Sequence, residues 1–120
     1  MRSTLLAAGA ALLLSAAQPA TAHHGWGSYD ASKVLVFESK IIEANYSFPH
    51  GEASIEVEAP NKKKWRLILA PPSRMENRGL SRDMLVPGKV IKVEGYPSKV
   101  HDDEMRVERV TIDGRVIEMR

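Results

Sequence analysis

The sequence predicts a small, mainly β domain: an OB-like barrel of five to six strands with a short helical connector between strands 3 and 4. Three observations support this prediction. Apolar and polar residues alternate along most of the chain after position 33, which is typical of strands. One central segment, residues 73–86, has helix signals instead, and a helix after the third strand matches the order of elements in an OB-type barrel. A plain β-sandwich is the alternative, because periodicity does not give strand order.

Ahead of this domain we expect an N-terminal signal peptide over residues 1–22. Arg2 supplies a positive start, residues 5–17 form an apolar run of suitable length, and residues 20–22 (Ala-Thr-Ala) fit a small-x-small cleavage site. The run is too short to cross a bilayer comfortably. The sequence therefore predicts export to the periplasm or the medium, with no membrane span after cleavage.

The remaining 98 of the 120 residues suffice for one small domain. Cleavage removes one basic side chain, Arg2, so sixteen basic and fifteen acidic side chains leave a formal balance of +1. Near-neutrality argues against nucleic-acid binding, which needs a surface of one sign. Cysteine is absent, which excludes disulfides and thiolate metal sites. We divide the mature chain into an N-terminal arm, residues 23–33, and the barrel, residues 34–120.

Three strands are expected in the first half of the barrel. Residues 34–46 are rich in β-branched and aromatic types. Residues 53–58 alternate strictly between apolar and polar types, which indicates one face in water. Residues 60–63 (Pro-Asn-Lys-Lys) form a turn into a third alternating segment, residues 65–69, so these two strands are predicted to pair as a hairpin.

The connector follows a pair of prolines. Ser73 stands where an N-cap would, Glu76 follows three residues later, and Gly79 can end the turn. Ser81 offers a second start. We therefore predict one or two short helical turns within residues 73–86.

Strands resume in the second half. Residues 90–97 and residues 105–112 are strand-like and are separated by a charged loop, residues 99–103. Asp113-Gly114 is a strong signal for a two-residue hairpin turn, which predicts a returning strand over residues 115–119.

Several blocks spread over the mature chain form a recognisable set. They are His23-His24-Gly25-Trp26, Tyr29-Asp30, Asn45 to Pro49-His50, Leu69-Ala70-Pro71-Pro72-Ser73-Arg74-Met75, Arg78-Gly79-Leu80, Val93-Glu94-Gly95-Tyr96-Pro97 and Met105-Arg106. This set resembles a family of small exported bacterial proteins that is catalogued as a domain of unknown function. The resemblance implies export and a small β-barrel but no established activity. One departure is Ser39, where the family pattern leads us to expect a glycine that allows a bulge or a sharp coil.

The cleavage site places a histidine pair at the start of the mature chain. The α-amino group and imidazole of His23 can chelate one metal ion, and His24 follows directly. Copper(II) favours tetragonal nitrogen ligands, so copper is the expected metal, with His23, His24 and His50 as candidate ligands. Two geometries are open: the α-amine with the imidazoles of His23 and His50, as in a histidine brace, or the α-amine, a deprotonated amide and the His24 imidazole.

His50 is the best candidate for a distant ligand. It lies at the corner between the first two predicted strands, after Pro49 with its fixed φ and before Gly51, which tolerates any φ. Such a corner could present the imidazole rigidly to the arm, and an exposed turn histidine is the alternative. The fourth histidine, His101, precedes acidic residues without the spacing of a calcium loop, and we expect a solvated turn there.

Two further groups of side chains bear on function. We expect Trp26 and Tyr29 to anchor the arm by burying their rings while their polar ends stay in water. Arginines follow the third strand at four-residue spacing and recur in the fifth; they could grip an anion or pair with nearby carboxylates. The arginines are Arg74, Arg78, Arg82 and Arg106, and the carboxylates are Glu76, Asp83 and Glu104.

The sequence contains no phosphate loop, nucleophile elbow or HExxH motif, and we name no catalytic residue. It predicts an exported small β-barrel that binds copper through its mature N-terminal histidines. The alternative is a non-enzymatic barrel module that binds a small anionic ligand or a partner protein without a metal. A redox enzyme built on a histidine brace is a remote third option.

Overall fold

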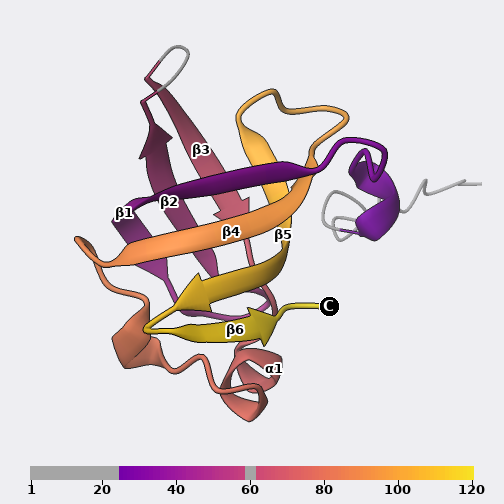
Figure 1. Ribbon diagram of the computed structural model, residues 1–120. Coiled ribbons are helices and arrows are strands. Elements are labelled where there is room, and N and C mark those ends of the chain that lie inside the picture. The colour runs from indigo at the N-terminus through magenta and orange to yellow at the C-terminus, as the bar shows by residue number, and fades with distance from the viewer. Residues whose placement is uncertain (1–24, 59–61) are drawn as a thin grey trace, which may run out of the picture.

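The strands form one sheet that closes on itself (Figure 1). The structure is a computed structural model that describes residues 25–58 and 62–120. Its elements, in chain order, are η2 (Trp26–Ser28), β1 (Leu35–Asn45), β2 (Glu52–Val57), β3 (Lys63–Ile68), α1 (Pro72–Asn77), η3 (Arg82–Met84), β4 (Val90–Pro97), β5 (Glu104–Ile112) and β6 (Arg115–Glu118). The predicted leader, His23 and His24 lie outside the described residues.

Closure depends on one parallel pairing. The strand order is β3-β2-β1-β4-β5-β6, and β3 also pairs with β5, so that β1 to β5 make a closed ring and β6 is an extra strand beside β5. The β3–β5 pair is parallel, whereas the other pairs are antiparallel. This is the OB-like barrel that the sequence predicts, and the closed ring excludes the β-sandwich.

Strand β1 pairs with two different strands along its length. Its first half pairs with β4 and its second half with β2, and a register shift between Ile41 and Glu43 marks a bulge at the change of partner. Ser39 occupies the position where a glycine was expected, and its hydroxyl donates to the carbonyl of Glu56 in β2 at 2.7 Å. The strand therefore bends without a glycine at position 39, and the extra residue lies three positions later.

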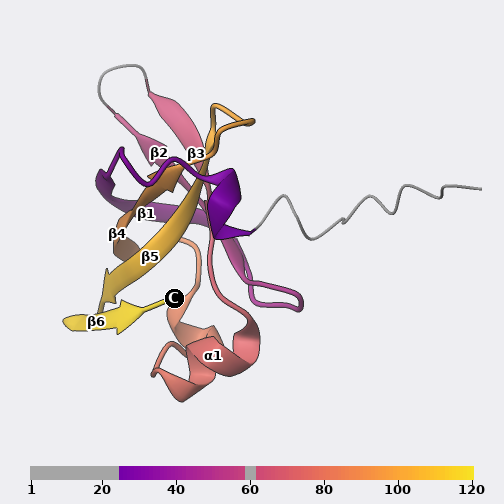
Figure 2. The same ribbon diagram turned by 90° about the vertical axis from the view of Figure 1, so that its right-hand side faces the viewer.

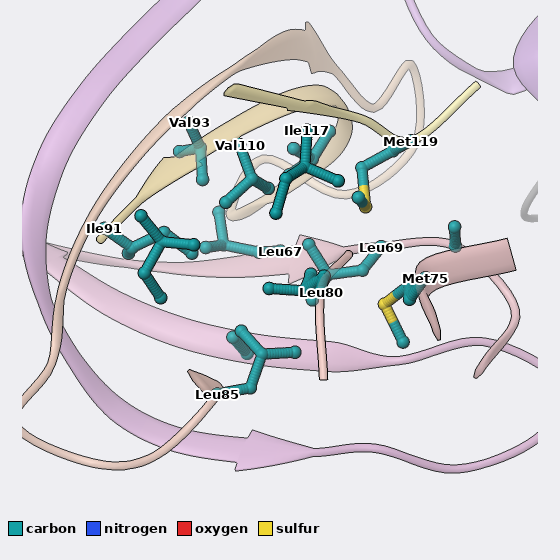
Figure 3. Packing of buried hydrophobic residues seen from close by; sticks show 14 of the residues in the cluster. Leu67, Leu69, Met75, Leu80, Leu85, Ile91, Val93, Val110, Ile117 and Met119 are labelled. Atoms are coloured by element: carbon teal, nitrogen blue, oxygen red, sulfur yellow. The ribbon is translucent and has the colours of Figure 1, made fainter. Parts of the chain in front are cut away.

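The core fills the inside of this ring (Figure 3). Inward-facing side chains alternate with outward-facing ones along each strand, as the period of two requires. The labelled residues of Figure 3 lie at 5% exposure or less: Leu67, Leu69, Met75, Leu80, Leu85, Ile91, Val93, Val110, Ile117 and Met119. Each fully buried apolar side chain of this size contributes about 1.5–3 kcal/mol. Met105 belongs to the same core, whereas Met84 is only partly buried against it.

The connector lies at one end of the barrel, with α1 at the bottom in both views (Figures 1 and 2). The prediction that Ser73 is the N-cap was wrong: the helix begins two residues earlier, with Pro71 as N-cap and Pro72 in the first turn. Proline suits that position because the first helical N–H groups have no intrahelical partner and its φ is already helical.

The predicted end of this helix is confirmed. Gly79 has a φ of +96°, and the amides of Leu80 and Gly79 donate to the carbonyls of Met75 (2.8 Å) and Glu76 (3.1 Å). These two bonds make a Schellman motif, in which the left-handed residue is usually glycine. The second helical turn, η3, follows Ser81 as predicted.

The hairpin between β5 and β6 is also confirmed. Asp113 and Gly114 both have positive φ, 51° and 74°, which is the requirement of the two-residue turn that matches the twist of a hairpin.

The described part of the arm lies on the outside of the barrel, beside β5 in Figure 2. Tyr29 forms an isolated antiparallel bridge with Ser98, and the amide of Asp30 donates to the carbonyl of Pro97 at 2.9 Å. The amide of Lys99 donates in turn to the carbonyl of Ser28 at 3.0 Å. These bonds tie the arm to the end of β4. In the described part of the chain, no helix is long and apolar enough to span a membrane.

Candidate functional site

His50 lies in the loop between β1 and β2, and its side chain is half-buried. Its Nδ1 is 3.2 Å from the carbonyl oxygen of Gly51. A carbonyl oxygen only accepts, so Nδ1 is the donor in this contact. At metal sites a neighbouring oxygen commonly holds one ring nitrogen of a histidine in this way while the other nitrogen binds the metal.

The loop is fixed to the barrel at Gly51, but for a different reason from the predicted one. The amide of Gly51 donates to the carbonyl of Ala70, and its carbonyl accepts from the amide of Leu69, both at 2.9 Å. Its φ is not positive, unlike those of Gly79, Gly88 and Gly114. A Cβ on Gly51 would lie 2.6 Å from Cε of Met75, so a larger residue here would have to displace the flexible end of Met75, and the φ of Gly51 does not itself require a glycine.

Trp26 anchors the arm through cations rather than through the apolar core. Arg106 and Arg120 place their guanidinium carbons 4.8 Å and 4.5 Å from the indole centroid. The ring of Tyr96 meets the indole edge-on, with centroids 6.3 Å apart and planes at 72°. Each cation–π contact at such a site contributes about 0.5–1 kcal/mol, so the three contacts together hold Trp26 in place.

Tyr29 provides the second anchor and is only 2% exposed. Its hydroxyl donates to Oε2 of Glu104 at 2.9 Å, and Arg66 approaches Oε1 of the same carboxylate at 3.6 Å. The prediction of a ring with its polar end in water was therefore wrong for Tyr29. Burial, with the hydrogen bond to Glu104 as a second cause, raises the pKa of the Tyr29 phenol.

Strand register brings the arm and the His50 loop onto the same face. Glu52 is the partner of Ile68 in β3, and Ile68 is the partner of Arg106 in β5, on which Trp26 stacks. Neighbouring strands lie about 4.8 Å apart, so the backbones of Glu52 and Arg106 are about 10 Å apart. His50 is two residues before Glu52. Glu52, the second residue after the predicted distant ligand, thus lies on the same outer surface as Arg106, two strands from it.

Three positive charges gather beside this surface. Burial lowers the pKa of the Arg106 guanidinium, and the nearby charges of Arg74 and Arg120 lower it further, against an opposing effect of Tyr29.

The described arginines after β3 do not form one helical face, because α1 ends before Arg82. Nor do Arg74 and Arg78 show the expected carboxylate pairing: they donate to the carbonyls of Met119 and Glu118, both at 3.2 Å.

His101 lies in an exposed turn, as predicted. Glu104, three residues later, faces the arm and is buried, so it does not join an acidic tip. Among residues 25–58 and 62–120, no group of three or more His, Asp or Glu side chains is placed to hold a metal ion.

Sequence reasoning missed the partners of the arm. The strand pattern around residue 105 shows that Glu104 and Arg106 share the face opposite to Met105, but two charged residues on one face usually indicate contact with water. Glu104 and Arg106 are only 2% and 7% exposed, because the arm crosses that face and covers them. The aromatic residues Trp26 and Tyr29 were the available signal that the arm covers part of the barrel.

Comparisons with known proteins agree with the barrel. The model of a family of unknown function, DUF6152, matches residues 10–106. A search of curated proteins found no match. Among solved structures, a ZRD-deleted mutant of TiaS in complex with agmatine matches with 16% identity and a TM-score of 0.53, over 75% of this chain and 27% of that one. A complex of TiaS with a transfer RNA and ATP matches with 16% identity and a TM-score of 0.49, over 77% and 20%. The chain thus spans about a quarter of the TiaS chain it matches, and at this identity the likeness shows the fold alone.

Proposed function

Because the chain belongs to the DUF6152 family of unknown function, which provides no activity to transfer, we propose a function from the site itself: an exported copper-binding protein. The ligands are the α-amine and imidazole of His23 with the imidazole of His50, or the His24 set described above. Its role is to bind copper, for sequestration or delivery, and not to catalyse a reaction.

The observation that supports this proposal most is the anchoring of the arm on the face that ends at the His50 loop. Trp26 is held by Arg106 and Arg120, only three residues after His23. An extended residue spans at most about 3.6 Å, so the chain between Trp26 and His23 limits the α-amine to within about 11 Å of Trp26. The start of β2, two residues after His50, lies two strands from Arg106, or about 10 Å, a separation that such a segment can span.

Export is tested by the mass of the protein recovered from the periplasm of a bacterial expression host. We expect a mature chain that begins at His23. A chain that begins at any other residue would end the proposal for the α-amine, because only a first-residue histidine offers its amine and imidazole to one metal.

The ligand set is tested by copper(II) titration of this mature chain and two variants, His50→Ala and His101→Ala. Loss of one of three nitrogen ligands is expected to weaken binding about tenfold or more, comparable to the loss of a supporting group at other metal sites. His101→Ala is the matched control, since it removes an exposed histidine far along the chain. Equal affinities for His50→Ala and the unchanged protein would exclude His50 as a ligand and leave the His24 geometry.

A second candidate function rests on the three arginines. The positive charges of Arg74 and Arg120 lie close enough to Arg106 to lower its pKa, and a bound anion would relieve that repulsion. In this case the protein binds a small anionic ligand without a metal. Titration with sulfate at constant ionic strength is expected to raise the melting temperature of the unchanged protein, and Arg120→Met should abolish the rise. An identical rise in both proteins would exclude this site.

A further inference from the structure

A groove of about 460 Å³ runs over the outer surface of β1, β2 and β3. Its volume lies in the lower part of the range of sites that hold small molecules, roughly 300–1,000 Å³. The residues that line it are mostly polar: Glu43, Ala44, Asn45, Glu52, Ala53, Ser54, Lys64, Trp65, Arg66 and Asp103. Among the described residues no histidine lines it, and Glu52, two residues after His50, is its lining residue nearest in sequence to a proposed copper ligand.

A negative and a positive side chain lie on opposite sides of the groove, and they do not pair with each other. Within the described ranges, Glu43 on β1 and Lys64 on β3 form no ion pair with any residue. Strand β2 lies between them, with Ser54 opposite Glu43 and Glu56 opposite Lys64. Two strand spacings and the two-residue offset between Ser54 and Glu56 put their backbones about 12 Å apart, too far for the two side chains to pair readily across β2.

Two hydrogen-bond donors lie between these charges. Arg66 is oriented by Glu52, whose Oε1 accepts from Nε at 3.2 Å and from Nη2 at 3.1 Å; its Nη1 makes no hydrogen bond with the described residues. Ser54, opposite Arg66, buries its hydroxyl without a hydrogen-bond partner among those residues. A buried hydroxyl without a partner is uncommon, and this hydroxyl would have to turn toward the groove to meet an acceptor there.

We propose that this groove binds short peptides with two free termini. The terminal ammonium lies at Glu43, and the terminal carboxylate lies at Lys64 and Nη1 of Arg66. The lining carries three carboxylates and two cations, a formal balance of −1, which does not suit a simple anion. The separation of the two unpaired charges suits a ligand longer than one amino acid, because a single residue places its ammonium and carboxylate only about one residue length apart.

Binding is tested by amide NMR of the copper-free protein with a chelator present, since peptides bind copper themselves. Triglycine is the probe, with N-acetyl-triglycine, triglycinamide and glycine as its comparisons. We expect triglycine to shift the amides of Asn45, Ser54 and Arg66. The two capped peptides each lack one terminal charge, and glycine is too short to reach both ends of the groove. Each of the three is expected to bind about fivefold more weakly, which corresponds to the loss of one exposed ion pair. Absence of shifts with triglycine, or equal binding of the capped peptides or of glycine, would overturn the proposal.

Lys64→Met tests the carboxylate end with little risk to folding, because Lys64 is exposed. Its affinity for triglycine should fall about threefold to fivefold. Lys92→Met is the matched control, an exposed lysine on β4 outside this groove, and should bind as the unchanged protein does. Equal affinity for Lys64→Met and Lys92→Met would contradict the assignment. Neither result depends on copper, so failure here leaves the proposed function untouched.

Discussion

Tyr29 contacts a carboxylate that water does not reach. Both Tyr29 and Glu104 are 2% exposed, and the phenol donates to Oε2 at 2.9 Å. A buried carboxylate oxygen that loses its donor costs the protein about 1–3 kcal/mol. This hydrogen bond therefore contributes to the attachment of the arm and to the stability of the domain.

Tyr29→Phe tests this contribution and its pH dependence. The folded pKa of Tyr29 is raised above the ordinary value of about 10, so the unfolded chain ionises first. The contribution is then complete below pH 10 and is lost as the pH rises from there toward the folded pKa. We expect Tyr29→Phe to be about 1–3 kcal/mol less stable in urea unfolding at neutral pH, with a gap that narrows above pH 10. A gap that stays constant or widens above pH 10 would contradict the assignment.

At this scale the sequence predicted which residues anchor the arm but not what they touch. Aromatic rings in a segment without core periodicity indicated burial of Trp26 and Tyr29. Their partners, Arg106 and Glu104, come from a strand about eighty residues later, and contacts between such distant segments depend on closure of the barrel, which no local pattern encodes.

Among the elements, β4 and β5 leave no room between them for a side chain at Gly95. A Cβ there would lie 2.0 Å from the carbonyl oxygen of Arg106 and 2.9 Å from Cα of Val107. Both are backbone atoms of the neighbouring strand, at the register shift between Glu94 and Gly95. Neither atom can move aside as the end of a long side chain can.

Gly95→Ala is therefore expected to lower the free energy of unfolding by about 3 kcal/mol or more, at the upper end of the cost of overpacking. Gly27→Ala is the control, because a Cβ at that position meets nothing within 4 Å; we expect a change within about 0.5 kcal/mol. Urea unfolding followed by circular dichroism measures both. A cost below about 1 kcal/mol for Gly95→Ala, well under the usual cost of overpacking, would mean that the two strands are less close than described.

The arm is the element on which the proposed copper site depends. If Trp26 positions the N-terminus near His50, Trp26→Ala should release the arm, and His50 should then contribute little to copper binding. We expect copper affinity to fall in Trp26→Ala about as much as in His50→Ala, and the double variant to be little worse than either. Such non-additivity is the sign of two residues that act through one site. Fully additive losses would show that Trp26 does not position this site.

Most elements could be predicted from local patterns. Residue types, alternation and the Asp113-Gly114 turn signal together located all six strands. Gly79 marked the helix end, and Asp113, Gly114 and Gly79 all have a positive φ. The helix start was misplaced because Ser73 has the chemistry of a cap, whereas Pro72 in the first turn determined where the helix begins. The change of partner along β1 was not predictable, since a strand reads the same whichever neighbour it pairs with.

For the whole molecule, closure of the barrel produces two adjoining outer surfaces. One carries the arm, stacked through Trp26 on Arg106, and ends toward His50. The other is the groove over β1 to β3. Arg66 connects the two surfaces, because it contacts Glu104 under the arm and Glu52 in the groove. Neither surface follows from composition, because both depend on the β3–β5 pairing that brings the third and fifth strands together.

The central claim is that the α-amine of His23 is a copper ligand, and one added residue tests it most directly. A mature chain that begins at His23 is compared with the same chain preceded by one glycine, by copper(II) titration and electron paramagnetic resonance. The added glycine moves the amine out of the chelate ring that it forms with the His23 imidazole while it keeps every side chain. We predict that binding weakens about tenfold or more and that the nitrogen hyperfine pattern changes. Equal affinity with an unchanged spectrum would contradict the account.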